Sequence, residues 1–355
     1  MTIEDAINSV KPADPDAYRA AQARLDRLTK PQGSLGRLED LAARWAAMTG
    51  DVKPAIPRAA VYTFAADHGV VAEGVSAYPS AVTAQMVLNF VRGGAAVNVL
   101  ARHVGAEVRV VDIGVAHDFG TVPGLIARKV AKGTKNFLRE PAMTDDEARR
   151  AVTVGVELAE QAVHDGFGLL GTGEMGIGNT TASAAIAAVY TELPVAQVVG
   201  RGTGVDDAGL ARKTTVIQQA LAQHGFASRL GPADPWEVLR KVGGLEIAGL
   251  AGLIVGAAAL RVPVVLDGFI AGAAALIAVG LQPNCRDYLL ASHRSVEAGH
   301  QAVLDRLALS PLLTLDLRLG EGTGACLGIG LVLASLKIMT EMATFGEAGV
   351  SERQG

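Results

Sequence analysis

The spacing of apolar positions along the chain changes near residue 58. In residues 1–55, apolar side chains recur at helical intervals over 18–28 and 35–48, with a polar, turn-rich link between the two segments. From residue 58, short β-branched apolar runs alternate with helical patterns. Near-continuous apolar runs of this kind are typical of a parallel sheet whose two faces are both covered by helices.

The predicted strands are apolar and are followed by small or acidic residues: 59–66, 108–115, 167–171, 195–199, 262–266 and 288–291. The predicted helices that separate them are 82–104, 144–164, 180–190, 206–223, 245–260, 269–279 and 295–307. In open α/β sheets, ligands bind beyond the carboxyl ends of the strands. We therefore expect the functional residues in the segments that follow these strands.

The last helical pattern, residues 323–342, is expected to return and pack with the N-terminal helices. The predicted fold is α/β: a mostly parallel sheet with helices on both faces (Rossmann-like), plus a small helical domain built from both termini. The predicted division is residues 1–57 and 323–345 for the helical domain and 58–322 for the α/β domain. Residues 346–355 are predicted to be a frayed tail.

The composition narrows the class of protein. Half of the 355 residues are hydrophobic, 42 are glycine and only 4% are aromatic, which favours closely packed helices around a core of small aliphatic side chains. The net charge of −4, with no Lys/Arg-rich run beside aromatics, argues against a nucleic-acid partner. The two cysteines lie far apart in the sequence, so we expect two buried thiols and no disulfide framework.

Two apolar windows, 243–260 and 322–338, fall short of the roughly 20 strongly apolar residues that a membrane span needs. The first twelve residues carry acidic side chains and no long apolar core, unlike a secretory signal. The expectation is a cytoplasmic protein with no membrane partner.

The densest glycine motif, GTGEMGIGNTT at residues 171–181, lies between a predicted strand and a predicted helix. Backbone N–H groups in such a loop, together with a helix N-terminus, favour an anion, so we interpret it as a phosphate site; the alternative is a tight packing turn. Its glycines also match the dinucleotide fingerprint, with Glu192 about 20 residues further on. However, Glu174 would place negative charge at the pyrophosphate, and Glu192 precedes the next strand. A dinucleotide-binding oxidoreductase is therefore the weaker interpretation.

A second glycine loop occupies residues 200–207, with Asp206 or Asp207 as the expected helix cap. Lys213 follows about two turns into that helix. It is a candidate for holding a phosphate, and the alternative is an ordinary solvated lysine. His68, in Asp67-His68-Gly69, is interpreted as a hydrogen-bonded histidine or a pocket wall. The histidines show no spacing typical of metal ligands, so no metal site is expected.

Two helix starts carry candidate chemistry. Glu321 lies between Gly320 and Gly322, immediately before the helical pattern of 323–342. It is interpreted either as a catalytic base or as a carboxylate that favours the positive end of the helix dipole, and the residues alone leave both open. Ser80 is the expected cap of the helix from residue 82, with Gln85 and Met86 in its first turns. These are either an ordinary helix start or a wall for a flat aromatic ligand.

Four motifs taken together resemble one family: DHGV at 67–70, GEMGIGNTT at 173–181, DGF at 267–269 and LRLGEGTGA at 317–325. They resemble, in order and over about residues 25–342, the nicotinate-nucleotide–dimethylbenzimidazole phosphoribosyltransferases. The resemblance implies a cytoplasmic homodimer that needs no metal and no cofactor. It also implies conversion of nicotinate mononucleotide and 5,6-dimethylbenzimidazole to α-ribazole 5′-phosphate and nicotinate, in cobalamin biosynthesis. A non-catalytic nucleotide- or base-binding paralogue is the alternative.

The resemblance also implies roles for individual residues. The general base would be Glu321, because the incoming benzimidazole loses its N–H proton while nicotinate leaves as a neutral ring and needs no acid. The other expected contacts are Glu174, Gly176, Gly178, Asn179 and Lys213 for the phosphate and ribose, Ser80, Gln85, Met86 and Leu319 for the benzimidazole, and Asp267 and Ser292 for nicotinate.

Overall fold

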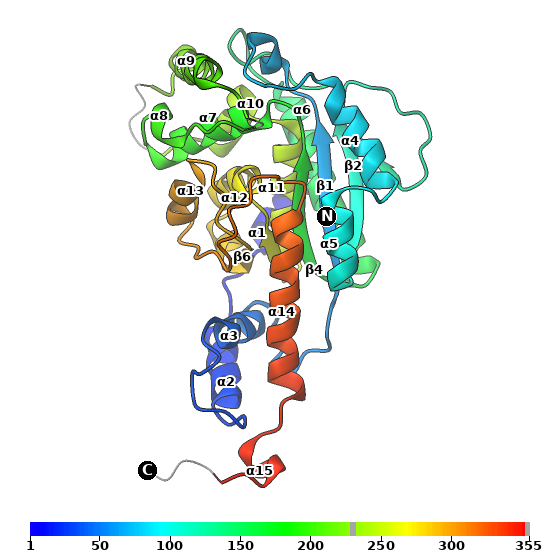
Figure 1. Ribbon diagram of the computed structural model, residues 1–355, viewed down its shortest axis with the longest axis vertical. Coiled ribbons are helices and arrows are strands. Elements are labelled where there is room, and N and C mark those ends of the chain that lie inside the picture. Colours follow the sequence, from blue (N-terminus) through cyan, green and yellow to red (C-terminus); the bar gives the residue numbers. More distant parts are fainter. Residues whose placement is uncertain (203, 228–231, 352–355) are drawn as a thin grey trace.

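The computed structural model describes residues 1–202, 204–227 and 232–351. Within them the strands form a six-stranded sheet in the order β3-β2-β1-β4-β5-β6 (Figure 1). Every neighbouring pair is parallel. The strands are β1 (Arg58–Ala66), β2 (Glu107–Gly114), β3 (Leu125–Ala127), β4 (Phe167–Met175), β5 (Val264–Leu266) and β6 (Leu289–Ala291). The direction of strand order reverses between β1 and β4, which is where ligands bind in sheets of this type.

The helices of the described residues are α1 (Ile3–Ser9), α2 (Pro15–Leu25), α3 (Arg37–Thr49), α4 (Ala81–Val91), α5 (Ala96–Val104), α6 (Asp145–His164), α7 (Asn179–Thr191), α8 (Val195–Val198), α9 (Asp207–Gln223), α10 (Pro235–Val242), α11 (Leu245–Ala259), α12 (Phe269–Leu281), α13 (His300–Arg306), α14 (Thr323–Glu341) and α15 (Phe345–Ala348), with 3₁₀ helices η1 (Gly69–Glu73) and η2 (Pro283–Tyr288). On one face α11 packs against α6 and contacts β1, β2 and β4. On the other, α14 crosses β1, β4, β5 and β6, beside α4 and α5 (Figure 1). The predicted α/β fold, with a parallel sheet covered on both faces, is confirmed.

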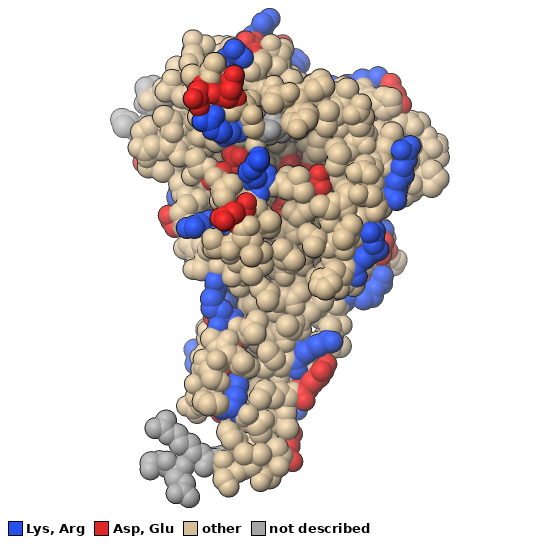
Figure 2. All heavy atoms as spheres, in the orientation of Figure 1, with Lys and Arg blue, Asp and Glu red and all other residues tan. Residues whose placement is uncertain are grey.

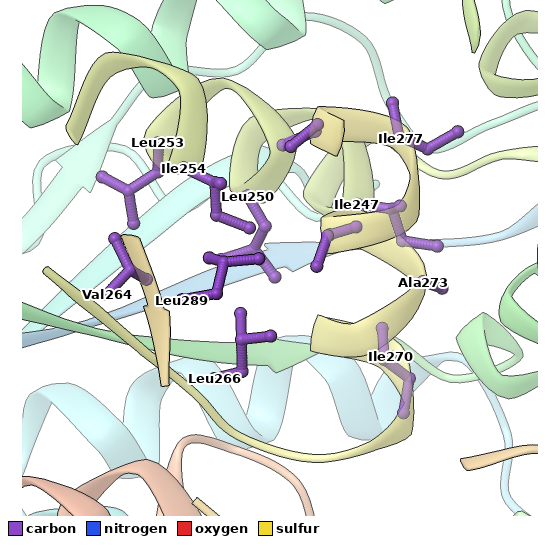
Figure 3. Close-up of a cluster of buried hydrophobic side chains, with 14 of the residues drawn as sticks. Ile247, Leu250, Leu253, Ile254, Val264, Leu266, Ile270, Ala273, Ile277 and Leu289 are labelled. Atoms are coloured by element: carbon purple, nitrogen blue, oxygen red, sulfur yellow. The ribbon is translucent and has the colours of Figure 1, made fainter. Parts of the chain in front are cut away.

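Small residues set the distance between α6 and α11. A side chain at Gly155 of α6 would overlap the carbonyl of Gly249, and one at Gly252 of α11 would overlap the carbonyl of Val152. The two helices therefore touch backbone to backbone, as the glycine-rich composition predicts. Beside this contact, aliphatic side chains of α11 and α12 meet those of β5 and β6 in a fully buried cluster (Figure 3).

Several predicted elements differ from the structure. Residues 195–198, predicted as a strand, form the short helix α8, because Pro194 in front of it has the backbone angle of a helix start. The predicted helix 82–104 is two helices, because Gly93 (φ +78°) ends α4. The predicted helix 295–307 begins only at His300. Strand β4 continues to Met175, four residues beyond the prediction, and neither β3 nor α10 was expected.

Helix α14 connects the sheet to the helices near the N-terminus. It contacts β4 and α5, and it also contacts α3 and α2 (Figure 1). Beyond its end, Thr29 donates a backbone hydrogen bond to Ala343 (3.0 Å). Helix α1 packs instead on α11 and α6. The division into a helical domain of residues 1–57 and 323–345 and an α/β domain of 58–322 stays a prediction. In the predicted tail, residues 345–348 form α15, and residues 352–355 lie outside the described part of the chain.

Among the described helices, α14 is long and apolar enough to cross a membrane, by length and composition only. Of its apolar window, 56% is buried inside the fold. A core helix of a globular protein passes the same test, so this property alone is weak evidence for a membrane span.

Candidate active site

A cleft of about 460 Å³ opens beyond the carboxyl-terminal ends of the central strands. Figure 2 shows it as a hollow over the start of α14, with acidic side chains inside. Six of the residues predicted for the site line it: Met86, Glu174, Gly176, Asn179, Leu319 and Glu321. These come from α4, the end of β4, the start of α7 and the turn before α14. The fold thus brings together segments up to 235 residues apart in the sequence (86 to 321).

The turn that carries Glu321 has an unusual backbone. Gly320, Glu321 and Gly322 are all in the left-handed region, with φ of +83°, +66° and +102°. For a residue with a side chain this conformation costs roughly 1–2 kcal/mol. Surrounding contacts hold it there: the Glu321 carbonyl accepts a hydrogen bond from Thr63 Oγ1 of β1 (3.0 Å). That carbonyl also lies against Gly173 of β4, where any side chain would overlap it.

Asp267, which follows β5, fixes the other side of the turn. Its Oδ2 accepts a hydrogen bond from the N–H of Gly322 (2.9 Å), and its Oδ1 accepts from those of Gly324 (2.7 Å) and Ala325 (3.1 Å). The carboxylate of Asp267, which lies just after β5, therefore caps the N-terminus of α14. Asp267 lies beneath the cleft floor, with Ser292 Oγ donating to its carbonyl (3.2 Å). The predicted contacts of Asp267 and Ser292 with nicotinate stay predictions.

The carboxyl group of Glu321 lies in the wall of the cleft, and its pKa is raised. The residue is only 6% exposed and lines the cleft. Burial, and then the nearby charge of Asp267, raise the pKa of Glu321 to about 7. A carboxyl group with this pKa is both deprotonated and appreciably basic near neutral pH.

Glu174 is the second carboxyl group in the cleft. Burial is the main cause that raises its pKa to about 8, and Asp267 and Glu246 add to it. Its Oε2 accepts a hydrogen bond from the Asn179 side chain, and its Oε1 occupies the space that a side chain at Gly320 would need. Glu174 therefore links the end of β4, the start of α7 and the Glu321 turn.

Behind Glu174, His68 and Glu246 form a fully buried pair with Nε2 and Oε1 2.7 Å apart. This confirms His68 as a hydrogen-bonded histidine. Among the described residues there is no group of three or more His, Cys, Asp or Glu side chains arranged to hold a metal ion. Both cysteines, Cys285 and Cys326, are buried and free.

The glycine motif of residues 171–181 is shorter as a loop than predicted. Gly171 and Gly173 belong to β4, and side chains there would meet α14 and the Glu321 carbonyl respectively. Only residues 176–178 form a turn, with Gly178 (φ +96°) immediately before the first residue of α7. The first two glycines are therefore packing positions, and the phosphate role stays a prediction for Gly176, Gly178 and Asn179.

Lys213 is not a solvated lysine. It is 1% exposed, and its Nζ donates to Thr180 Oγ1 (2.7 Å) and to the Gly200 carbonyl (3.2 Å). Burial lowers its pKa to about 8, and Glu297 opposes this shift. Thr180 and Gly202 line the cleft in front of Lys213. Asp206 caps α9 as predicted, whereas Thr203 of the second glycine loop lies outside the described residues.

Two predicted base contacts do not line the cleft. Ser80 precedes α4 without making a side-chain capping bond, and Gln85 is exposed on that helix. Several cleft residues were missed by the sequence analysis: Tyr78, Ile177, Thr180, Phe269, His293, Ser295, Glu297 and Arg318. Most of them adjoin motifs that were singled out. Glu297 does not, and its only signal was a carboxylate in the first half of a predicted amphipathic helix.

Known proteins resemble this chain over nearly its whole length. The family model described as "Phosphoribosyltransferase" matches residues 10–350. Nicotinate-nucleotide–dimethylbenzimidazole phosphoribosyltransferases from Geobacter sulfurreducens and Chloroflexus aggregans are both 59% identical, over 350 and 352 residues. The matches cover 99% of this chain in both cases, and 98% and 99% of those proteins. The crystal structure of CobT from Thermus thermophilus has a TM-score of 0.90 and 50% identity, covering 96% of this chain and 100% of that one. The chain therefore belongs to the nicotinate-nucleotide–dimethylbenzimidazole phosphoribosyltransferase family, whose members are pentosyltransferases.

Proposed function

We propose that the protein transfers the phosphoribosyl group of nicotinate mononucleotide to 5,6-dimethylbenzimidazole, with Glu321 as the general base. The products are α-ribazole 5′-phosphate and nicotinate, and the reaction belongs to cobalamin biosynthesis. The names of the relatives support the reaction. The observation that carries the role of Glu321 is its position: a buried carboxyl group of pKa about 7, held on a strained turn in the cleft wall.

The chemistry of the step matches this site. Nicotinate in the mononucleotide is a pyridinium and leaves as a neutral ring, so the leaving group needs no proton. The benzimidazole attacks the anomeric carbon with one nitrogen and loses a proton from the other. One positioned base therefore suffices, and such a group contributes roughly 10²–10⁴-fold in rate. The ionised carboxylate of Glu321 in the same cleft also favours a positively charged ribosyl centre.

The lining of the cleft combines two kinds of surface. Gly176 precedes α7, and Asn179 and Thr180 begin it, with Lys213 bonded behind Thr180; a helix N-terminus with a buried ammonium group suits a phosphate. Met86, Ile177 and Leu319 provide apolar and thioether surface for a flat base. We therefore assign the phosphate to the start of α7 and the benzimidazole to the surface beside Glu321.

We also propose that the protein is a cytoplasmic homodimer. Four large hydrophobic side chains are exposed in segments at or beside the cleft: Tyr78, Val296, Leu315 and Leu319. Tyr78 and Leu319 line the cleft itself. Apolar surface of this kind next to a site is typical of a protein–protein contact. A mass in solution of twice the 36.5 kDa chain, by light scattering, is the expected result.

The test of the base is Glu321→Gln, which keeps the size of the side chain and removes its basicity. We expect kcat to fall at least about tenfold while the KM for nicotinate mononucleotide changes little, with nicotinate release followed by chromatography. Glu157→Gln, an exposed carboxylate of α6, is the matched control. Unchanged turnover in Glu321→Gln contradicts the role of Glu321. Absence of nicotinate release by the unmodified protein contradicts the function itself.

A further inference from the structure

Glu297 is a buried carboxylate with an unsatisfied oxygen. It lies between β6 and α13, lines the cleft and is 9% exposed. Its backbone is fixed, because its N–H donates to Ser295 Oγ (3.3 Å) and its carbonyl accepts from the N–H of His300 (3.0 Å). Among the described residues, no group makes a hydrogen bond to its buried Oε2. Buried carboxylate oxygens are normally bonded, so within the described residues this one lacks its usual partner and is free to accept from a ligand.

Gly200 makes the position of Glu297 possible. Any side chain at Gly200 would overlap Oε2 of Glu297. The carbonyl of the same glycine accepts a hydrogen bond from Lys213. The carboxylate and the ammonium group therefore both lie against Gly200, and the charge of Glu297 favours the protonated form of Lys213. Lys213 in turn holds Thr180 of the cleft wall, so Glu297 is next to the proposed phosphate site.

The substrates offer few groups that suit a carboxylate here. The phosphate and the nicotinate carboxylate are anions and are repelled by it. In the proposed function, the benzimidazole N–H is directed to Glu321. The ribose hydroxyls remain, and they are hydrogen-bond donors that lie one sugar away from the phosphate.

We propose that Glu297 accepts a hydrogen bond from a ribose hydroxyl of the nucleotide substrate, and so selects a ribonucleotide at this position. The inference rests on the proposed function. Glu297 is then a substrate-binding residue, and its buried oxygen has a hydrogen-bond partner in the complex with the nucleotide. A hydrogen bond to a charged acceptor that is desolvated in this way is among the stronger ones in proteins.

The experiment measures kcat/KM of the unmodified protein and of Glu297→Ala. Each is tested with the natural nucleotide and with two analogues, 2′-deoxy- and 3′-deoxy-nicotinate mononucleotide, so that the effect of the variant and the effect of each missing hydroxyl form a thermodynamic cycle. The unmodified protein should lose at least about tenfold with the analogue that lacks the bound hydroxyl. Glu297→Ala should lose at least about tenfold with the natural nucleotide, and less than about threefold more with that analogue. Glu297→Gln keeps a neutral hydrogen-bond acceptor, so its kcat/KM should lie between those of the unmodified protein and Glu297→Ala. It replaces the alanine variant in the cycle if that variant does not fold.

Three results overturn the inference in distinguishable ways. If the losses from the variant and from each analogue multiply, Glu297 acts only as the counter-charge of Lys213. If the unmodified protein accepts both deoxy analogues as well as the natural nucleotide, neither hydroxyl is bound. If the unmodified protein releases no nicotinate at all, the proposed function fails together with the inference. Asp305→Asn, an exposed carboxylate on α13, should behave like the unmodified protein throughout.

Discussion

Asp267 accepts a hydrogen bond from the backbone N–H of Gly322, the residue that follows the proposed base, at 2.9 Å. The same carboxylate binds two further N–H groups of the α14 N-terminus. A single side chain thus fixes the position of Glu321 and, through its charge, raises the pKa of Glu321. Position and basicity of the base are therefore coupled through one residue that does not line the cleft.

Replacing Asp267 by Asn should separate these two effects. The amide carries no charge, so the pKa of Glu321 should fall and the acidic limb of the kcat/KM profile should move to lower pH. The amide has only one acceptor oxygen for three N–H groups, so kcat should also fall at every pH. The profile is measured with Asp305→Asn as the control. An acidic limb that stays in place or moves to higher pH contradicts the electrostatic role.

The pH dependence of the unmodified protein follows from the pKa of Glu321. A base works only when deprotonated, so kcat/KM should fall about tenfold per pH unit below pH about 7. The residual activity of Glu321→Gln should lack this limb. A midpoint near pH 4.5, the ordinary value for a glutamate, would show that Glu321 is not the group that titrates.

Glu174 should reduce stability at neutral and alkaline pH. Its pKa of about 8 in the folded protein is above the unfolded value of 4.5. The folded state therefore binds the proton more tightly, and stability is lost as pH rises from 4.5 to about 8. Glu174→Gln removes this loss, so its Tm relative to the unmodified protein should be higher above the folded pKa, at pH about 8.5, than at pH about 5. A Tm difference that is independent of pH contradicts the shifted pKa.

Gly320 should not tolerate alanine, for two separate reasons. Its φ is +83°, which costs a residue with a side chain roughly 1–2 kcal/mol, and the added methyl group would overlap Glu174. Gly225 has φ +81° with open space around it, so Gly225→Ala measures the backbone cost alone. We expect Gly320→Ala to have the lower Tm and to lose at least about tenfold in kcat. Equal Tm values and retained activity would contradict the contact with Glu174.

The buried pair of His68 and Glu246 should contribute strongly to stability. Glu246→Ala leaves the buried Nε2 of His68 without its hydrogen-bond partner, and an unsatisfied buried polar group costs about 1–3 kcal/mol in the free energy of unfolding. The exposed pair of Lys135 and Glu140 is the comparison, and Glu140→Ala should cost less than about 1 kcal/mol. Chemical denaturation measures both. Similar costs for the two variants would contradict a structural role for the buried pair.

The sequence was sufficient for the fold class and for most of the strands, because most strands are short, largely apolar runs followed by small or acidic residues. It was insufficient where the same sequence pattern is compatible with two different local structures. The run at 195–199 has strand-like composition, yet residues 195–198 form a short helix that begins after Pro194 and packs on α7 and α9. The glycines at 171 and 173 resemble a phosphate loop. Only the packing of α14 on β4 shows that a side chain at either position would overlap a neighbouring segment.

For the site, Glu321 is conspicuous locally as a carboxylate between two glycines, and the family resemblance adds Glu174. The state of Lys213 was not predictable, because its burial depends on Thr180 and Gly200 from other segments. Asp267 was predicted as a ligand contact, and its three bonds to the start of α14 depend on the position of β5 beside β4. Glu297 lies in no motif and looks, by sequence, like an ordinary carboxylate of a predicted helix. Its significance comes from an oxygen without a partner, which only three-dimensional coordinates reveal.

Helix α14 links the turn that carries Glu321 to helix α2 near the N-terminus. Its first residue follows the turn of Glu321, and its 19 residues make a rod about 28 Å long. At the far end, Arg24 of α2 donates to the carbonyl of Met339 (2.8 Å), and Phe345 donates to that of Arg27 (3.0 Å). An uninterrupted helix is stiff along its axis, so a displacement of α2 should also displace the turn that carries Glu321. The position of the proposed base therefore depends on contacts at the opposite end of α14, outside the sheet.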